Sequence, residues 1–339
     1  MPNIKHILVI RLSAMGDVAM TVPVLRAFQE QYPDIKLTVL TREFFKPFFR
    51  DLKNVSVFSA DVKRKHKGVL GLYKLSKELK KLNTDAVADL HNVLRSNILK
   101  FFLLGIKVVQ IDKGRKAKQA LISGKEVKQL KTTVERYADV FRRLGFLLDL
   151  SNPKFPEKKA LSNKAIEIIG SDTKEWIGIA PFAAYESKMY PLDLLTEVIN
   201  SLSKKYRILL FGGGKHEIEQ LNKLQDEFEN VTSIAGKLSL KEEIDVISNL
   251  DVMLSADSGN GHIAAMLGIK VVTIWGVTHP FAGFTPFNQP TDYCLLPDRD
   301  KFPKIPTSIY GNKYPENYKE AIRSISPETI VNKINSILS

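Results

Sequence analysis

The sequence predicts an α/β fold made of two Rossmann-like domains, and three observations lead to this prediction. Short apolar runs alternate with amphipathic helix patterns in the first half of the chain, and the alternation starts again in the second half. The runs are apolar throughout, which is typical of parallel sheets covered by helices on both faces. The chain has 339 residues, whereas an ordinary domain holds roughly 150. We therefore expect two parallel sheets in succession.

The first half contains four expected strands and four helix patterns. The strands cover residues 7–10, 37–40, 55–58 and 86–90. The helices cover residues 18–32, 70–82, 97–104 and 132–144. In the last of these helices Tyr137, Phe141 and Leu144 are spaced for one apolar face, as in a helix that packs on a sheet.

A domain boundary is expected at residues 149–159, where two prolines and polar residues interrupt the periodicity. We place the first domain at residues 1–155 and the second at 156–339. Expected strands of the second domain cover residues 176–180, 207–211, 231–234, 250–256 and 271–275. Expected helices cover residues 191–204, 216–229 and 240–249. Residues 292–317 read as an irregular region, and the last helix, 327–338, is a candidate to pack back on the first domain.

The composition indicates a soluble globular protein. Hydrophobic residues make up 44% of the chain and charged residues 26%. No apolar run approaches the ~20 residues that span a bilayer, and the N-terminus enters a strand without a signal peptide. The single cysteine, Cys294, excludes an intrachain disulfide and a thiolate metal cluster. We therefore expect a cytoplasmic protein.

The net charge of +13 indicates an anionic partner. Nucleic acid, an anionic membrane surface and a phosphorylated substrate are the candidates, and the alternative is a protein kept soluble by its lysines. Two basic clusters, at residues 61–68 and 112–118, fall in predicted loops. They either line a site for an anionic acceptor or membrane, or are solvated loops. Nucleic acid is disfavoured because no aromatic residues interleave with the clusters.

One candidate site follows the first strand, where Gly16 and Asp17 open a helix pattern. Ligands of parallel sheets bind at the carboxyl ends of the strands, so Asp17 could accept a proton from an attacking hydroxyl there. The alternative is that Gly16 makes the turn and Asp17 caps the helix. The glycine spacing matches neither a dinucleotide fingerprint nor a P-loop.

The strongest candidate site is the loop that crowds Asp257, Ser258, Gly259 and His262 between an apolar strand and a small-residue helix pattern. The first turn of a helix has free backbone N–H groups and a partial positive charge, so this loop suits a diphosphate. Alone, His262 would more often be a capping or packing residue.

Three further loops of the second half carry polar or glycine residues at strand ends. Lys188 could neutralise a phosphate or bond a ribose, with a solvated lysine as the alternative. Gly212 and Gly213 permit a close backbone approach, and Glu217 could bond a ribose diol or complement its own helix. The loop at residues 275–280, which contains Thr278, could cover the same cleft with polar groups.

Taken together, these motifs resemble glycosyltransferase family 9, the bacterial lipopolysaccharide heptosyltransferase family. The resemblance runs in order through nearly the whole chain: residues 10–25, 89–97, 134–145, 256–265 and 274–280. It implies a GT-B architecture, in which two Rossmann-like domains face each other across a cleft that holds the active site. It also implies an inverting, metal-independent transfer of a sugar, typically heptose from ADP-heptose, with no cofactor besides the nucleotide-sugar substrate.

The resemblance also implies residue roles. Asp17 matches the base. Lys188, Gly212, Gly213, Glu217, Asp257, Ser258, Gly259 and His262 match donor-binding positions. Basic residues for a phosphorylated acceptor fall at Lys63, Arg64, Lys65, Lys67 and Arg95. The implied partners are a nucleotide-sugar donor, an anionic lipopolysaccharide-type acceptor and the cytoplasmic surface of the inner membrane, but not nucleic acid.

Three alternatives stay open at this point. A family 9 transferase could use another nucleotide sugar, which a donor panel would reveal. A non-catalytic protein on the same fold could hold an anionic glycan or nucleic acid on its basic surface. A sugar-nucleotide epimerase or dehydrogenase would need a dinucleotide, and the missing glycine fingerprint argues against it.

Overall fold

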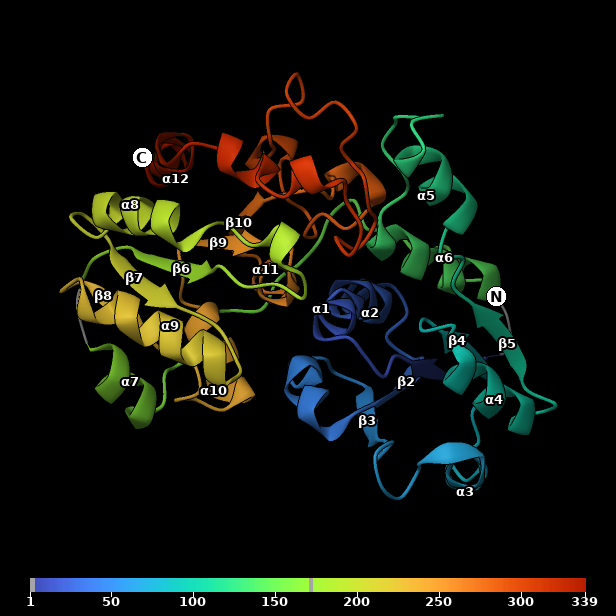
Figure 1. Cartoon of the computed structure of the whole chain (residues 1–339). Helices are drawn as coiled ribbons and strands as arrows, with labels where there is room; N and C mark the ends of the chain where they lie inside the picture. The colour runs from blue at the N-terminus through green and yellow to red at the C-terminus, as the bar shows by residue number, and fades with distance from the viewer. Residues whose placement is uncertain (1–3, 171–172) are drawn as a thin grey trace. The chain divides into compact units, whose positions relative to one another are not determined.

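The computed structural model describes residues 4–170 and 173–339, which form two compact units (Figure 1). The first unit holds the chain up to residue 113 and residues 133–154, and the second holds residues 114–132 and 155–339. The last crossing between the units, from Lys154 to Phe155, lies one residue from the expected boundary. Segment 114–132, expected in the first domain, belongs to the second unit.

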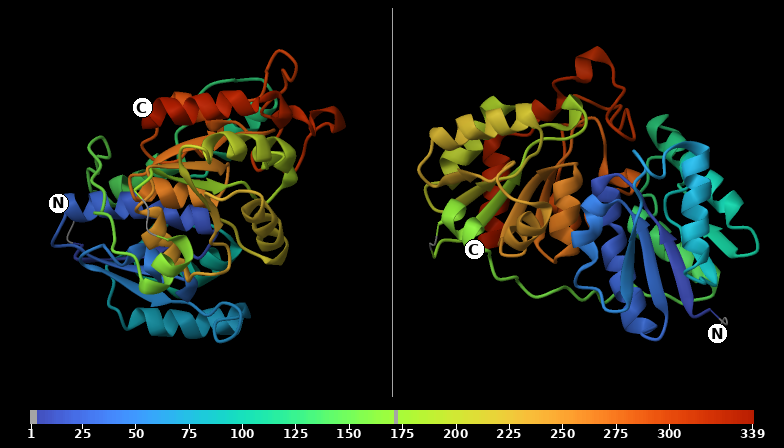
Figure 2. Two further views of the ribbon diagram at one scale, coloured as in Figure 1. Left: turned by 90° about the vertical axis from the view of Figure 1, so that its left-hand side faces the viewer. Right: turned by 90° about the horizontal axis from the view of Figure 1, so that it is seen from below.

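The first unit is a parallel sheet with helices on both faces (Figure 2). Its strand order is β3-β2-β1-β4-β5. The strands are β1 His6–Ile10, β2 Lys36–Thr41, β3 Val55–Ser59, β4 Ala86–Asp89 and β5 Lys107–Gln110. The helices are α1 Met15–Ala19, α2 Thr21–Gln31, the 3₁₀ helix η1 Glu43–Phe49, α3 Gly68–Lys80, α4 Leu94–Phe102 and α6 Thr133–Leu144.

Two elements of the first unit differ from the prediction. The expected helix over 18–32 is two helices, because α1 ends at Ala19 and α2 begins at Thr21, with Met20 as the capping residue between them. Strand β5 has no counterpart in the prediction. It is an edge strand with mostly exposed side chains, so its sequence lacks the apolar run of a buried strand.

The second unit is a six-stranded parallel sheet of order β11-β10-β9-β6-β7-β8. The strands are β6 Trp176–Ala180, β7 Arg207–Leu210, β8 Val231–Ser233, β9 Val252–Ala256, β10 Lys270–Ile274 and β11 Cys294–Leu295. The helices are α5 Arg115–Ile122, α7 Asn163–Ile169, α8 Leu192–Leu202, α9 Lys215–Asp226, α10 Leu240–Ile247, α11 Gly259–Met266 and α12 Pro327–Leu338. The 3₁₀ helices are η2 Glu186–Lys188, η3 Pro280–Ala282, η4 Thr291–Tyr293, η5 Glu316–Tyr318 and η6 Ala321–Ser324. Both tryptophans of the chain, Trp176 and Trp275, lie in this unit.

The last helix, α12, belongs to the core of the second unit. It packs on α8, and Ile330, Ile334 and Ile337 join the cluster that also holds the apolar residues of β6, β7 and β9. The additional packing of this helix on the first domain stays a prediction. An amphipathic pattern shows that a helix has an apolar face but not which sheet covers it.

Segment 114–132 is held in the second unit by a small apolar cluster. Leu121 and Leu130 pack with Ala282, and the backbone N–H of Leu130 donates to the carbonyl of Phe281 at 2.9 Å. The basic cluster at 112–118 is therefore not one loop, as predicted, because its second half forms the start of α5.

Among the helices of the described residues, none is both long enough and apolar enough to cross a bilayer.

Candidate active site

In the second unit, the predicted donor residues follow neighbouring strands of one sheet. β10, β9, β6 and β7 are adjacent and parallel, so the loops after them meet at the same edge. Lys188 follows β6, Glu217 follows β7, Asp257 follows β9 and Thr278 follows β10. The structure therefore gathers the residues that the sequence predicts at one carboxyl edge.

Lys188 and Asp257 form an ion pair at the centre of this edge. Lys188 Nζ lies 2.8 Å from Asp257 Oδ2, and the two side chains are 13% and 8% exposed. Thr278 Oγ1 donates to the same carboxylate oxygen at 3.0 Å. A lysine held in this way keeps its charge in a fixed, largely desolvated position, where it interacts strongly with a phosphate.

Close backbone packing supports the position of Lys188. A side chain on Gly276 would put its Cβ 1.9 Å from the carbonyl oxygen of Ser187. Ser187 Oγ donates to the carbonyl of Gly311 at 2.6 Å. Gly311 has φ +86°, and a Cβ there would lie 2.8 Å from the Lys188 stem. Gly276 and Gly311 are thus structural residues of the site. Gly276 lies in the loop 275–280 that the sequence analysis expected there, whereas Gly311 was not identified from the sequence.

Helix α11 begins at this edge with Ser258 as its N-cap residue. Ser258 Oγ lies 3.3 Å from Ser255 Oγ, and a Cβ on Gly261 would lie 3.2 Å from the same Ser255 oxygen. Gly259 is the first helical residue, and His262 is buried. The first-turn N–H groups of such a helix have no partner within the helix, so this end suits an anion.

Glu217 caps its own loop. Its Oε2 accepts the backbone N–H of Gly213 at 2.7 Å. A Cβ on Gly212 would lie 2.8 Å from Leu221 Cδ1 and 3.3 Å from the same carboxylate oxygen, so a larger residue there would have to displace these two side chains. This contact matches the structural alternative for Glu217. A ribose contact by Glu217 stays a prediction.

In the first unit, Asp17 lies in α1, directly after β1. Its Oδ2 is 2.6 Å from Arg11 Nη2 and accepts the backbone N–H of Ala14 at 3.3 Å. Arg11 is buried and donates through Nη1 to the carbonyl of Leu90 at 2.7 Å. The Asp17 side chain is 31% exposed. The arginine therefore holds a carboxylate that solvent, and hence a substrate, can reach.

His91 is a buried residue beside this pair that the sequence analysis did not single out. Burial, followed by the positive charge of Arg11, lowers the pKa of His91 to about 4, so the ring is neutral near pH 7. Asp89 Oδ1 accepts the backbone N–H of His91 at 3.0 Å. Lys100 Nζ lies 2.6 Å from Asp89 Oδ2. Two sequence signals pointed to it: a polar turn after an apolar strand, and its place in segment 89–97, on which the resemblance partly rests.

The predicted acceptor residues lie before α3 and at the start of α4. Lys63, Arg64 and Lys67 are exposed, whereas Lys65 Nζ is 2.8 Å from Glu78 Oε1 and so has an intrachain partner. Arg95 is exposed on α4. Burial, and then the positive charge of Arg95, lower the pKa of Arg42, the residue that follows β2.

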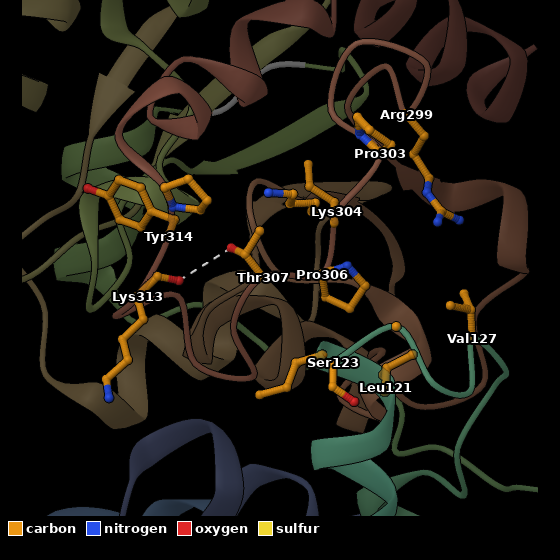
Figure 3. Close-up of a pocket in the computed structure, with 14 residues that line it drawn as sticks. Leu121, Ser123, Val127, Arg299, Pro303, Lys304, Pro306, Thr307, Lys313 and Tyr314 are labelled. Atoms are coloured by element: carbon orange, nitrogen blue, oxygen red, sulfur yellow. Dashed lines mark hydrogen bonds between the residues drawn. The ribbon is translucent and has the colours of Figure 1, made fainter.

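A separate cavity of 630 Å³ lies in the second unit (Figure 3). Its walls are the end of α5 and the segment 299–315, and none of the predicted site residues lines it. Thr307 Oγ1 donates to the carbonyl of Lys313 at 3.3 Å within this segment, as Figure 3 shows. The same segment supplies Gly311 to the packing around Lys188.

Among residues 4–170 and 173–339, no three side chains of His, Cys, Asp or Glu are grouped to hold a metal ion. Metal independence stays a prediction.

Comparison with known proteins agrees with this arrangement. The model of "Glycosyltransferase family 9 (heptosyltransferase)" matches residues 72–308. The lipopolysaccharide core heptosyltransferase OpsX of Haemophilus influenzae is 27% identical over 297 residues, which cover 84% of this chain and 82% of that protein.

Solved structures share the fold. A family 9 glycosyltransferase from Veillonella parvula superposes with a TM-score of 0.76 at 20% identity, covering 98% of this chain and 97% of that one. The Escherichia coli ADP-heptose lipopolysaccharide heptosyltransferase II superposes with a TM-score of 0.71 at 20% identity, covering 98% of both chains. The two units thus form the α/β GT-B fold that the sequence predicts.

Proposed function

Because the chain belongs to glycosyltransferase family 9, the heptosyltransferase family, we propose that it moves heptose from ADP-heptose to a phosphorylated lipopolysaccharide or related glycan acceptor. Membership of this family makes the protein a glycosyltransferase. The donor and acceptor are proposed by analogy with the relatives, whose names include lipopolysaccharide core and ADP-heptose. The observation that carries the proposal is the Lys188–Asp257 pair beside the N-terminal end of α11.

The second unit binds the donor in this proposal. The diphosphate lies at the N-terminal ends of α9 and α11, where free backbone N–H groups meet its charge. Lys188 adds a fixed positive charge and stabilises the ADP that forms. Ser258 and Gly259 line the diphosphate, Glu217 contacts the ribose, and His262 supports the loop.

In this proposal, the first unit binds the acceptor and supplies the base. The acceptor is held by the basic residues Lys63, Arg64, Lys65, Lys67 and Arg95. Its hydroxyl oxygen attacks the anomeric carbon as Asp17 takes the hydroxyl proton. The bond from the anomeric carbon to the β-phosphate oxygen breaks, and ADP leaves from the opposite face with its electron pair. The configuration is therefore inverted, and no metal is required.

The replacement Asp17→Asn tests the base. The variant should lose about 10²–10⁴-fold in transfer rate, because an amide cannot accept the proton. It should bind ADP as the wild type does, since Asp17 lies in the first unit and the predicted nucleotide site in the second. Asp34→Asn, an exposed change in the same unit, is the matched control. Near-normal turnover of Asp17→Asn would remove Asp17 from this role.

A panel of nucleotide sugars tests the donor. Transfer should be fastest with ADP-heptose, and NMR of the product should show the inverted anomeric centre. Activity should survive extensive treatment with a chelator. Faster transfer from another nucleotide sugar would contradict the heptose proposal. Glycan binding without turnover of any donor would favour a binding protein.

We also propose that the protein works in the cytoplasm, peripherally at the inner membrane, and does not act on nucleic acid. The net charge of +13 supports an anionic surface as a partner.

A further inference from the structure

The first unit carries a group of exposed apolar side chains on and just beyond α3 and α4. Its members, here called the α3–α4 patch, are Val69, Leu70, Tyr73, Leu94, Phe101 and Leu104. Their exposed fractions run from 46% for Tyr73 to 84% for Leu70. Single exposed hydrophobic residues are common, whereas a contiguous group usually marks a binding surface.

Ring contacts connect the two halves of the patch. The Tyr73 ring lies 5.4 Å from the ring of Phe102, which lies 5.7 Å from the ring of Phe101. The two helices also pack on each other and bury their opposite sides, including Leu75 and Leu99, in the core of the unit. Figure 1 shows α3 and α4 as neighbours within this unit. The apolar side chains of the patch are therefore not part of the hydrophobic core of this unit.

Half of the patch, namely Val69, Leu70 and Tyr73, lies in a strongly basic segment of the chain. Residues 61–81 contain eight Lys and Arg against two Asp and Glu, a net +6 out of the whole chain's +13. Lys74, Lys77 and Lys80 are exposed on α3, and Lys77 Nζ lies 4.6 Å above the Tyr73 ring. Apolar side chains bordered by lysines are typical of surfaces that enter the headgroup region of an anionic bilayer.

One end of the patch, formed by Val69, Leu70 and Leu94, lies at the edge of the sheet that carries Asp17. α1, α3 and α4 follow β1, β3 and β4, which are parallel, so all three helices start at the carboxyl edge. Val69 and Leu70 lie in the first turn of α3, and Leu94 opens α4. A bilayer on this surface would bring a membrane-held acceptor next to that edge.

We propose that the α3–α4 patch docks on an anionic lipid bilayer. The apolar side chains enter the boundary between headgroups and acyl chains, and the lysines of α3 contact lipid phosphates. The proposal rests on the membrane location given under Proposed function and specifies the surface. Lipid binding itself requires neither the donor nor the glycan.

The test measures binding of the full chain to vesicles that contain no glycan. Vesicles of phosphatidylethanolamine with phosphatidylglycerol should bind the protein, and vesicles of phosphatidylcholine should bind it far less. The double replacement Leu70→Ser and Leu104→Ser should weaken binding about tenfold or more. Leu147→Ser, at a side chain that is 86% exposed in the same unit but outside the patch, is the matched control and should bind as the wild type does.

A second variant tests the charge. Lys74→Gln with Lys80→Gln should weaken binding to the anionic vesicles, and the loss should shrink as salt rises. Equal vesicle binding by the wild type and Leu70→Ser/Leu104→Ser would overturn the proposal. A wild-type dimer that this double variant dissociates, with no vesicle binding, would also overturn it, because the patch would then join two copies.

Activity separates this proposal from the proposed function. With a soluble acceptor fragment, Leu70→Ser/Leu104→Ser should turn over the donor like the wild type. Vesicle binding that depends on the patch, in a protein that transfers no sugar, would uphold the docking surface and contradict only the transferase proposal.

Discussion

Lys188 gains its position from partners far away in the sequence. Asp257 forms an ion pair with Lys188, and Thr278 donates a hydrogen bond to Asp257. The neighbouring Ser187 donates a hydrogen bond to the carbonyl of Gly311, 124 residues away. A sequence pattern can place a lysine after a strand, as it did here. It cannot show that a remote loop folds back over that lysine, so Gly311 was not predicted as part of the site, and Gly276 was expected only as a member of the loop 275–280.

Replacing Lys188 should weaken nucleotide binding. Lys188→Met removes the charge proposed to meet the diphosphate and leaves Asp257 with Thr278 alone, so ADP affinity should fall about tenfold or more. Calorimetric titration with ADP measures this change. Lys223→Met, at an exposed position of α9, is the control and should bind normally. Unchanged affinity in Lys188→Met would exclude a contact with the nucleotide.

His91 should make the first unit sensitive to acid. Its pKa is lowered from 6.5 to about 4 in the folded protein, so between these values the unfolded chain binds the proton and the folded chain does not. Stability therefore falls as the pH drops through this window, by about 1–3 kcal/mol from this residue. Thermal unfolding at pH 7.5 and pH 5 should show a smaller loss for His91→Gln than for the wild type.

The exposed His216, replaced by Gln, is the control for this measurement. An equal loss between the two pH values in the wild type and His91→Gln would contradict the buried neutral state of His91.

At the scale of elements, most strands and helices could be predicted because they have buried, periodic apolar sides. Three of the exceptions have few buried side chains. β5 is exposed at a sheet edge, α5 is rich in basic residues, and α7 has seven residues with two buried side chains. Contacts with the rest of the fold, rather than an apolar periodicity of their own, stabilise these elements. Their sequences therefore resemble those of loops.

Gly276, where the loop after β10 contacts η2, should not tolerate a larger residue. Gly276→Ala would force its Cβ against the carbonyl of Ser187, where backbone must move, so we expect a loss of about 2–4 kcal/mol in unfolding free energy. Gly213→Ala, where the structure leaves open space around the Cβ, is the control for stability. Denaturant unfolding compares the two variants, and equal stability would contradict the close packing at Gly276.

At the scale of the whole molecule, the two Rossmann-like units follow from the repeated alternation in the sequence. The assignment of segment 114–132 does not. Its sequence precedes a helix of the first unit, and only the contacts of Leu121 and Leu130 with Ala282 place it in the second.

This assignment predicts how the second unit behaves alone. A fragment of residues 155–339 should be less stable than one in which residues 114–132 are joined to it by a flexible linker, because the first lacks the side chains that cover Ala282 and its neighbours. Thermal unfolding and ADP binding compare the two fragments. Equal melting temperatures would show that the segment contributes nothing to this unit.

Both tryptophans lie in the second unit, and this placement has a spectroscopic consequence. Light absorbed selectively by indole excites only that unit. Trp275 is buried and immediately precedes Gly276 and the loop that carries Thr278. The tryptophan fluorescence of the native chain therefore reports ligand binding and unfolding in the second unit without an added label. The first unit contributes no tryptophan fluorescence. A tryptophan introduced into the first unit of a Trp176→Phe, Trp275→Phe background would report the other half separately.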